Sequence, residues 1–139
     1  SNIIIFSPGT QHSSLLPTYI SDYLGENIYL NKNCLKVFIS NIGADYENPV
    51  YIASDYIINS SKYLNMSSKN KHLTSDFFNF LLINDPINNL ENKVKFDQKI
   101  IDMNIDYIRS NLENNEQNGI HDGKKIVDLI LNKFENFNV

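Results

Sequence analysis

The sequence predicts an α/β fold with a mainly parallel sheet, because short apolar runs alternate with helical patterns along the chain. Residues 3–6, 35–39 and 80–83 are apolar runs of strand length, and each ends in a polar loop. Helical spacing of apolar residues follows the first two runs, over about 15–24 and about 51–64. Strand and helix units joined by right-handed crossovers place their strands parallel in one sheet.

The first unit has the clearest pattern. Residues 3–6 form an unbroken apolar run, which is typical of a strand buried on both faces. Pro17 fits only within the first turn of the helix that follows, and Gly25 is expected to cap its C-terminus. The sequence therefore predicts a buried strand, a small polar loop and a helix ending at Leu24.

Weaker patterns fill the second half. We expect a short helical turn ending at Phe77, a short edge strand over 94–96, a helical turn over 97–103 and a strand over 105–108. Asp122 is a plausible N-cap for an amphipathic helix whose apolar residues are Ile126, Val127, Ile130, Leu131 and Phe134.

Composition excludes several classes of protein. The chain has 139 residues and a net charge of −4, and it lacks the basic face that a nucleic-acid-binding surface needs. Its one cysteine, Cys34, cannot form an intramolecular disulfide. No signal peptide or apolar run of about 18 residues occurs, so we expect a single cytoplasmic domain with no membrane or nucleic-acid partner.

The three polar loops, 7–14, 40–51 and 84–88, should meet at the carboxyl edge of the sheet, where α/β folds bind ligands. The first loop opens a helix, whose free N–H groups suit a phosphate or carboxylate. Its candidate binding residues are Pro8, Gly9, Thr10, Gln11, His12, Ser13 and Ser14. Two alternatives remain open: Ser13 or Ser14 caps the helix, and His12 is either an acid/base group or merely exposed.

The second loop and the helix after it carry two carboxylates, Asp45 and Asp55. Together with ligand phosphates they could hold Mg²⁺, which commonly uses one or two protein carboxylates, and they are the candidate catalytic residues. The alternative is local: Asp45 makes an Asx-turn and Asp55 supports the helix start. Further candidate binding residues are Asn41, Gly43, Tyr46 and Ser54.

In the third loop, Asn84 precedes Asp85 and Pro86, which suits either a plain turn or an amide that binds a ligand. Zinc is poorly supported, since the histidines and the cysteine lack the spacing of a closed site. These residues are His12, His72, His121 and Cys34.

Residues 3–17 resemble a motif of the CofD-like proteins, a family that includes 2-phospho-L-lactate transferase and the YvcK-type gluconeogenesis factors. The motif is a hydrophobic strand, a Gly-Pro-Gly-Ser/Thr loop, paired Ser/Thr and a helix-opening Pro, and Ser7 stands where Gly is usual. Residues 51–56 resemble the family's Tyr-Ser/Thr-Ala-Ser-Asp-His stretch, with Ile52 and Tyr56 replacing a hydroxyl residue and the His. Weaker similarities occur at residues 37–43, 82–84, 94–97, 105–108 and 121–125.

This resemblance implies a Rossmann-like three-layer fold. It also implies that residues 1–139 form a single domain, the C-terminal portion of a CofD-like domain truncated at the N-terminus, because the family's N-terminal glycine-rich loop is absent from this chain. A homodimer is one way to cover the open sheet edge that results.

The resemblance further implies a transferase that acts on a nucleotide-diphosphate-linked substrate. The family's transferase moves a phospholactyl-type group from a guanosine diphosphate-linked donor to a deazaflavin with Mg²⁺, whereas YvcK-type members bind UDP-sugars as regulators. Three hypotheses follow: a transferase whose isolated fragment is inactive, a non-catalytic nucleotide-sugar-binding regulator, or a scaffold that binds nothing alone. A nucleotide-linked small molecule is the expected partner under the first two.

Overall fold

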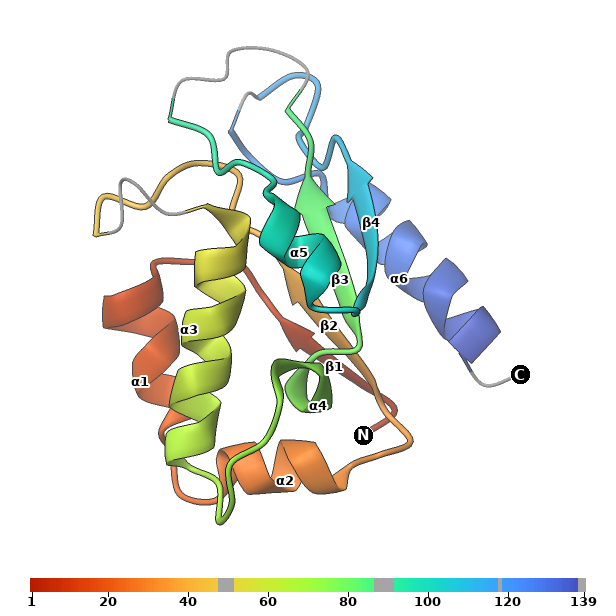
Figure 1. Cartoon of the computed structure of the whole chain (residues 1–139). Helices are drawn as coiled ribbons and strands as arrows, with labels where there is room; N and C mark the ends of the chain where they lie inside the picture. The colour runs from red at the N-terminus through yellow and green to blue at the C-terminus, as the bar shows by residue number, and fades with distance from the viewer. Residues whose placement is uncertain (48–51, 87–91, 118, 138–139) are drawn as a thin grey trace.

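The computed structural model describes residues 1–47, 52–86, 92–117 and 119–137 (Figure 1). Its sheet has four parallel strands in the order β1-β2-β3-β4, which confirms the predicted fold class. The strands are β1 (Ile3–Phe6), β2 (Leu35–Ile39), β3 (Phe80–Asn84) and β4 (Asp106–Ser110). Because all four run in the same direction, the loops that follow them lie at one edge of the sheet.

Helices cover both faces of the sheet and give it three layers. Figure 1 shows α1, α3, α4 and α5 on one side, α2 at the lower end next to α3 and α4, and α6 on the other side. The helical segments are η1 (Gln11–Leu15), α1 (Leu16–Tyr19), α2 (Leu24–Leu30), α3 (Ala53–Met66), α4 (Thr74–Phe77), α5 (Gln98–Asp102) and α6 (Gly123–Phe137). Among the described residues, no helix has the length and apolar character needed to cross a membrane.

The core has two parts, one on each face of the sheet. Successive side chains of a strand point to opposite faces, so Phe38 packs toward α1 to α5 while Val37 and Ile39 pack toward α6. Strands β2 and β3 are buried at every position, as their continuous apolar sequences predict.

The prediction that strand 3–6 is fully buried is wrong. β1 lies at the edge of the sheet, and only Phe6 is buried, whereas Ile5 is 51% exposed. The reason is that α6 packs over β2 and β3, which leaves part of this face of β1 uncovered. An apolar run shows that a strand can be buried on both faces but does not show which elements cover it.

The predicted single helix over 15–24 is also wrong. The chain makes one π-helical turn, η1, continues into α1, and then breaks before Tyr23, whose φ is +62°. Gly25 is not a C-cap but lies inside α2, where a Cβ would come within 1.9 Å of the Leu64 carbonyl oxygen. This glycine lets α2 pack directly against the end of α3.

Residues 94–96 do not form the predicted edge strand. Instead, Val94 N–H donates to the Ile42 carbonyl oxygen at 2.9 Å, and Gly43 and Lys93 form an isolated antiparallel bridge. The segment therefore crosses the carboxyl edge of the sheet beside the loop after β2. Parts of the predicted loops 40–51 and 84–88 lie outside the described residues.

The start of α6 follows the prediction. Asp122 Oδ1 accepts a hydrogen bond from Lys125 N–H at 3.1 Å, as an N-cap does. Ile126 and Ile130 are buried against the sheet, whereas Val127 and Leu131 are about half exposed.

Candidate functional site

Asn41 ties the loop after β2 to the loop after β1. Its Oδ1 accepts from Gly9 N–H at 3.2 Å, and its Nδ2 donates to the Gly9 carbonyl oxygen at 3.0 Å. The two loops that the sequence places at the carboxyl edge are thus brought together. Both polar ends of the Asn41 amide are used within the protein.

The N–H groups at the start of η1 are bonded to carboxylates of the same chain. Gln11 N–H donates to Asp45 Oδ2 at 2.8 Å, and the N–H groups of His12 and Ser13 donate to Glu47 Oε2 at 2.9 and 3.2 Å. These are the groups that the sequence offers to a phosphate or carboxylate. The start of η1 therefore does bind negatively charged oxygens, but they belong to Asp45 and Glu47 of the same chain. A phosphate or carboxylate of a ligand would have to displace Glu47 from the N–H groups of His12 and Ser13.

The side chains of the first loop divide into buried and exposed groups. Gln11 is 1% exposed, and its Nε2 donates to the Tyr56 carbonyl oxygen at 2.8 Å, so it braces the loop against α3. Ser13 and Ser14 are exposed, and no side chain caps η1, so the capping alternative is wrong. His12 is also exposed.

Both candidate catalytic carboxylates have structural roles. Asp45 Oδ1 accepts from Glu47 N–H at 3.0 Å, which is the Asx-turn that the sequence allowed. Asp55 Oδ2 accepts from Ile52 N–H at 3.4 Å at the start of α3. Both oxygens of Asp45 thus accept N–H bonds, and magnesium binding by Asp45 and Asp55 stays a prediction.

The other candidate residues are dispersed. Tyr46 is 83% exposed, whereas Ser54 is buried and its Oγ has no hydrogen-bond partner among the described residues. Asn84 is 1% exposed, and its Oδ1 accepts from Leu112 N–H at 2.8 Å. The Asn84 amide therefore holds the loop after β4 in place, which is a longer-range role than the plain turn that the sequence also allowed.

Glu113, which the sequence analysis did not identify, is the centre of a buried network below the loops. It accepts hydrogen bonds from Lys93 Nζ at 2.7 Å, Gly119 N–H at 3.0 Å and Asn84 Nδ2 at 3.2 Å. Burial raises the pKa of Glu113, but these three donors outweigh it and leave the pKa below its ordinary value. The carboxylate is therefore charged, and it ties its own loop after β4 to the end of β3 and to the loop after β3.

His121 connects the start of α6 to the end of β2. Its Nε2 lies 3.0 Å from the Ser40 carbonyl oxygen, and Ser40 Oγ accepts from Asn84 N–H at 3.0 Å. Burial lowers the pKa of His121, although the bond to Ser40 and the charge of Glu113 partly oppose this effect. The imidazole is therefore neutral near pH 7.

A cleft of about 240 Å³ opens between these loops. It is lined by residues 8–9, 41–43, 119 and 121. Four predicted binding residues reach it: Pro8, Gly9, Asn41 and Gly43. Gly119 and His121 were missed because the sequence assigned this stretch to a loop and a helix start; the only local signal was a histidine close to two glycines.

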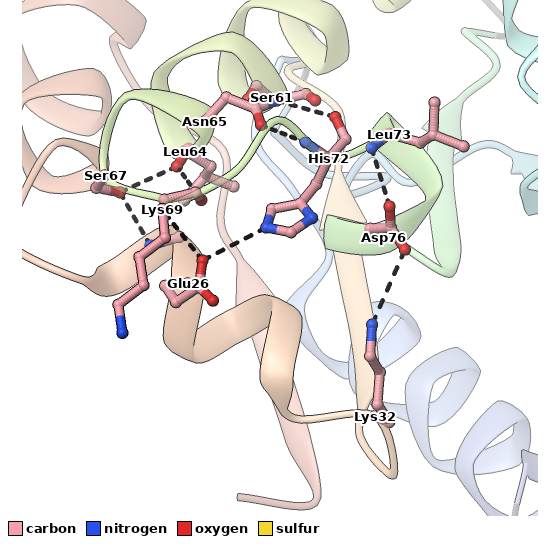
Figure 2. Close-up of polar contacts among 12 residues, drawn as sticks. Glu26, Lys32, Ser61, Leu64, Asn65, Ser67, Lys69, His72, Leu73 and Asp76 are labelled. Atoms are coloured by element: carbon pink, nitrogen blue, oxygen red, sulfur yellow. Dashed lines mark hydrogen bonds and ion pairs between the residues drawn. The ribbon is translucent and has the colours of Figure 1, made fainter.

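A second titratable cluster lies around α2 and the segment between α3 and α4 (Figure 2). Glu26 Oε2 accepts from Lys69 N–H at 2.9 Å and lies 3.4 Å from His72 Nε2, and the His72 ring stacks on Tyr29. The Lys69 N–H and His72 hold the pKa of Glu26 below its ordinary value. This cluster joins α2 to the segment between α3 and α4. Within the described residues, no three His, Cys, Asp or Glu side chains are grouped to hold a metal ion.

No protein-family model matches the sequence, and no curated protein sequence matches it either. Two crystal structures of the protein BH3568 from Bacillus halodurans, described as a member of the UPF0052 family, are similar to this structure. Their TM-scores are 0.75 and 0.76, at 20% and 19% sequence identity. In both comparisons 94% of this chain is covered, but only 43% of the other. The chain therefore has the α/β fold of a UPF0052 protein and spans less than half of that protein's length.

Proposed function

We propose that this chain forms one wall of a binding site for a nucleotide-diphosphate-linked small molecule, as part of a CofD-like transferase of the 2-phospho-L-lactate transferase type. The observation that carries the proposal is the cleft between the loops after β1 and β2 and the start of α6. It lies at the carboxyl edge of a parallel sheet, where open α/β folds bind nucleotides.

The chemistry of the cleft supports this choice. Gly9, Gly43 and Gly119 line it without side chains, so a ligand can approach the backbone closely. Its volume of about 240 Å³ is below the roughly 300–1,000 Å³ of complete small-molecule sites, which suits one portion of a larger ligand. The remainder of the ligand would be bound by a part of the protein outside this chain.

Two observations support the choice of the CofD-like family in this proposal. The sequence resembles CofD-like motifs in residues 3–17 and 51–56. The structural neighbour belongs to UPF0052, the family that includes CofD and YvcK. The substrate and the reaction come from the resemblance.

Calorimetry with a cleft-filling variant tests the proposal. A Cβ on Gly43 would come no closer than 3.6 Å to another residue, so Gly43→Leu should fold and occupy the cleft. We expect UDP-glucose or GDP to bind the 139-residue chain, and Gly43→Leu to weaken that binding at least tenfold with little change in melting temperature. Gly123→Leu, which adds a side chain in open space outside the cleft, is the matched control. Equal affinity in all three proteins would show that the ligand binds elsewhere, and no binding to the unmodified chain would contradict the proposal.

A non-catalytic, nucleotide-sugar-binding regulator is the second candidate. The observation that favours it is that Asp45 and Asp55 accept backbone hydrogen bonds that hold the loop and the start of α3, a structural role that requires no Mg²⁺. Mass spectrometry after incubating the intact parent protein with a GDP-linked donor, a deazaflavin acceptor and Mg²⁺ separates the two candidates. A transferred group supports the transferase, and UDP-sugar binding without transfer supports the regulator.

A further inference from the structure

The position of His121 indicates which portion of a ligand the cleft receives. The residue lies just before α6 and lines the cleft together with the backbone around Gly9 and Gly43. It is only partly buried and borders the cleft. Its chemical role depends on which imidazole nitrogen carries the hydrogen.

The hydrogen bond to Ser40 determines the tautomer of His121. A carbonyl oxygen can only accept, so at 3.0 Å the Nε2 atom must carry the hydrogen. Burial keeps the ring neutral near pH 7, and a neutral imidazole with hydrogen on Nε2 has a lone pair on Nδ1. Among the described residues, Ser40 is the hydrogen-bond partner of this ring, so Nδ1 is available as an acceptor.

The other polar groups of the cleft do not compete for this role. The Asn41 amide is joined to Gly9 at both ends. The nearby Lys93 and Glu113 side chains are paired with each other at 2.7 Å and are 8% and 9% exposed. An unprotonated Nδ1 can accept a hydrogen bond but cannot donate one, so it favours a ligand group that donates a hydrogen bond over a phosphate oxygen, which only accepts.

We propose that His121 Nδ1 accepts a hydrogen bond from a hydroxyl or N–H group of the ligand, so that the cleft binds an uncharged portion, such as a sugar ring, and not the phosphates. This inference rests on the proposed function and narrows it. The phosphates would then contact the rest of the site.

Nuclear magnetic resonance of the ¹⁵N-histidine-labelled chain tests the tautomer without any ligand. We expect the His121 signals, identified by their loss in His121→Gln, to show hydrogen on Nε2 and a lone pair on Nδ1 near pH 7. Hydrogen on Nδ1 would overturn the inference.

Calorimetry with UDP-glucose and UDP tests the contact. Removing the acceptor in His121→Leu should weaken UDP-glucose binding about tenfold, the cost of one hydrogen bond of roughly 1.4 kcal/mol, and leave UDP binding unchanged. His121→Gln, which retains a donor and an acceptor, should restore much of the affinity for UDP-glucose. Equal loss for both ligands in His121→Leu, or no loss for UDP-glucose, would overturn the inference.

A third measurement separates failure of this inference from failure of the proposed function. If neither nucleotide binds, glucose alone is titrated while the Nδ1 signal is followed. The backbone amide signal of Gly43 is followed in the same titration, because it can be compared between the unmodified chain and His121→Leu. A saturable shift in the unmodified chain that is missing in His121→Leu supports the cleft contact even though nucleotide binding has failed. No shift overturns the inference together with the proposed function.

Discussion

Asn41 and Gly9 are joined by two hydrogen bonds, so one amide side chain holds the loops after β1 and β2 in contact. Their positions in the polar loops after the first two predicted strands made both residues candidates for ligand binding. In the structure Asn41 lines the cleft and holds Gly9 in place beside it.

Replacing Asn41 should therefore lower stability and distort the cleft. Asn41→Ala leaves the N–H and the carbonyl of Gly9 without partners, and we expect a loss of about 1 to 3 kcal/mol in the free energy of unfolding. Asn41→Asp keeps the acceptor for Gly9 N–H and should lose less than Asn41→Ala. Urea unfolding measures both, with Asn136→Ala on the exposed side of α6 as the control. An Asn41→Ala protein as stable as this control would show that the pairing is unimportant.

Removing the charge of Glu113 should have a larger effect. Glu113→Gln leaves Lys93 buried beside a neutral group, and breaking a buried pair in this way costs about 3 to 5 kcal/mol. Because the pKa of folded Glu113 is lowered, its contribution is fully present above the ordinary value of 4.5 and is lost as the pH falls through the folded pKa.

The stability difference between the unmodified protein and Glu113→Gln should thus shrink as the pH falls from about 7 to about 3. Urea unfolding across this range measures it. A difference that is constant with pH would mean that the Glu113 carboxylate is not preferentially charged in the folded state.

Glu26 should act with His72 as a unit. Glu26→Gln weakens the acceptor for Lys69 N–H and for the His72 ring, so the melting temperature should fall at pH 7. His72→Phe preserves a ring that can stack on Tyr29 but removes the polar partner. Because the two side chains interact, the double variant should lose less stability than the sum of the single variants.

The pKa of Glu26 is also lowered, so its stabilisation is present above its ordinary value of 4.5 and lost on acidification. Thermal melts of the unmodified protein and of Glu26→Gln at about pH 7 and about pH 4 test this. The difference in melting temperature between the two proteins should be smaller at about pH 4. Glu116→Gln, an exposed site, is the control. Additive effects in the double variant would contradict the pairing.

Gly25 and Gly123 should respond in opposite ways to alanine. A Cβ on Gly25 would lie 1.9 Å from the Leu64 carbonyl oxygen, so Gly25→Ala must separate α2 from α3 and should cost at least about 1 to 3 kcal/mol. Gly123 has no atom within 4 Å of its added Cβ, and Gly123→Ala should be neutral or stabilise α6 by up to about 1 kcal/mol. Chemical denaturation of the two variants side by side tests this. A stable Gly25→Ala protein would show that the two helices are not in close contact.

The sequence alone was enough to predict β2, β3, most of α3 and the Asp122 cap, because their signals are local. A continuous apolar run or a helical repeat reflects the burial of neighbouring residues, and a cap depends on atoms only three residues apart. The parallel direction of the strands and the meeting of the loops at one edge were predicted from right-handed crossover connections, whereas the strand order came from the structure. These features placed Pro8, Gly9, Asn41 and Gly43 at the cleft.

Only the tertiary structure decided how the polar residues of the site are used. Glu47 bonds to N–H groups 34 and 35 residues away, and Glu113 bonds to Asn84 across 29 residues. It also decided that β1 is partly exposed and that Gly25 lies within a helix. Such outcomes depend on which distant segments pack together, so no local pattern encodes them. Thus the sequence determined the α/β framework and the edge of the sheet at which the candidate site lies, whereas long-range packing determined which polar atoms of that candidate site are already hydrogen-bonded within the protein.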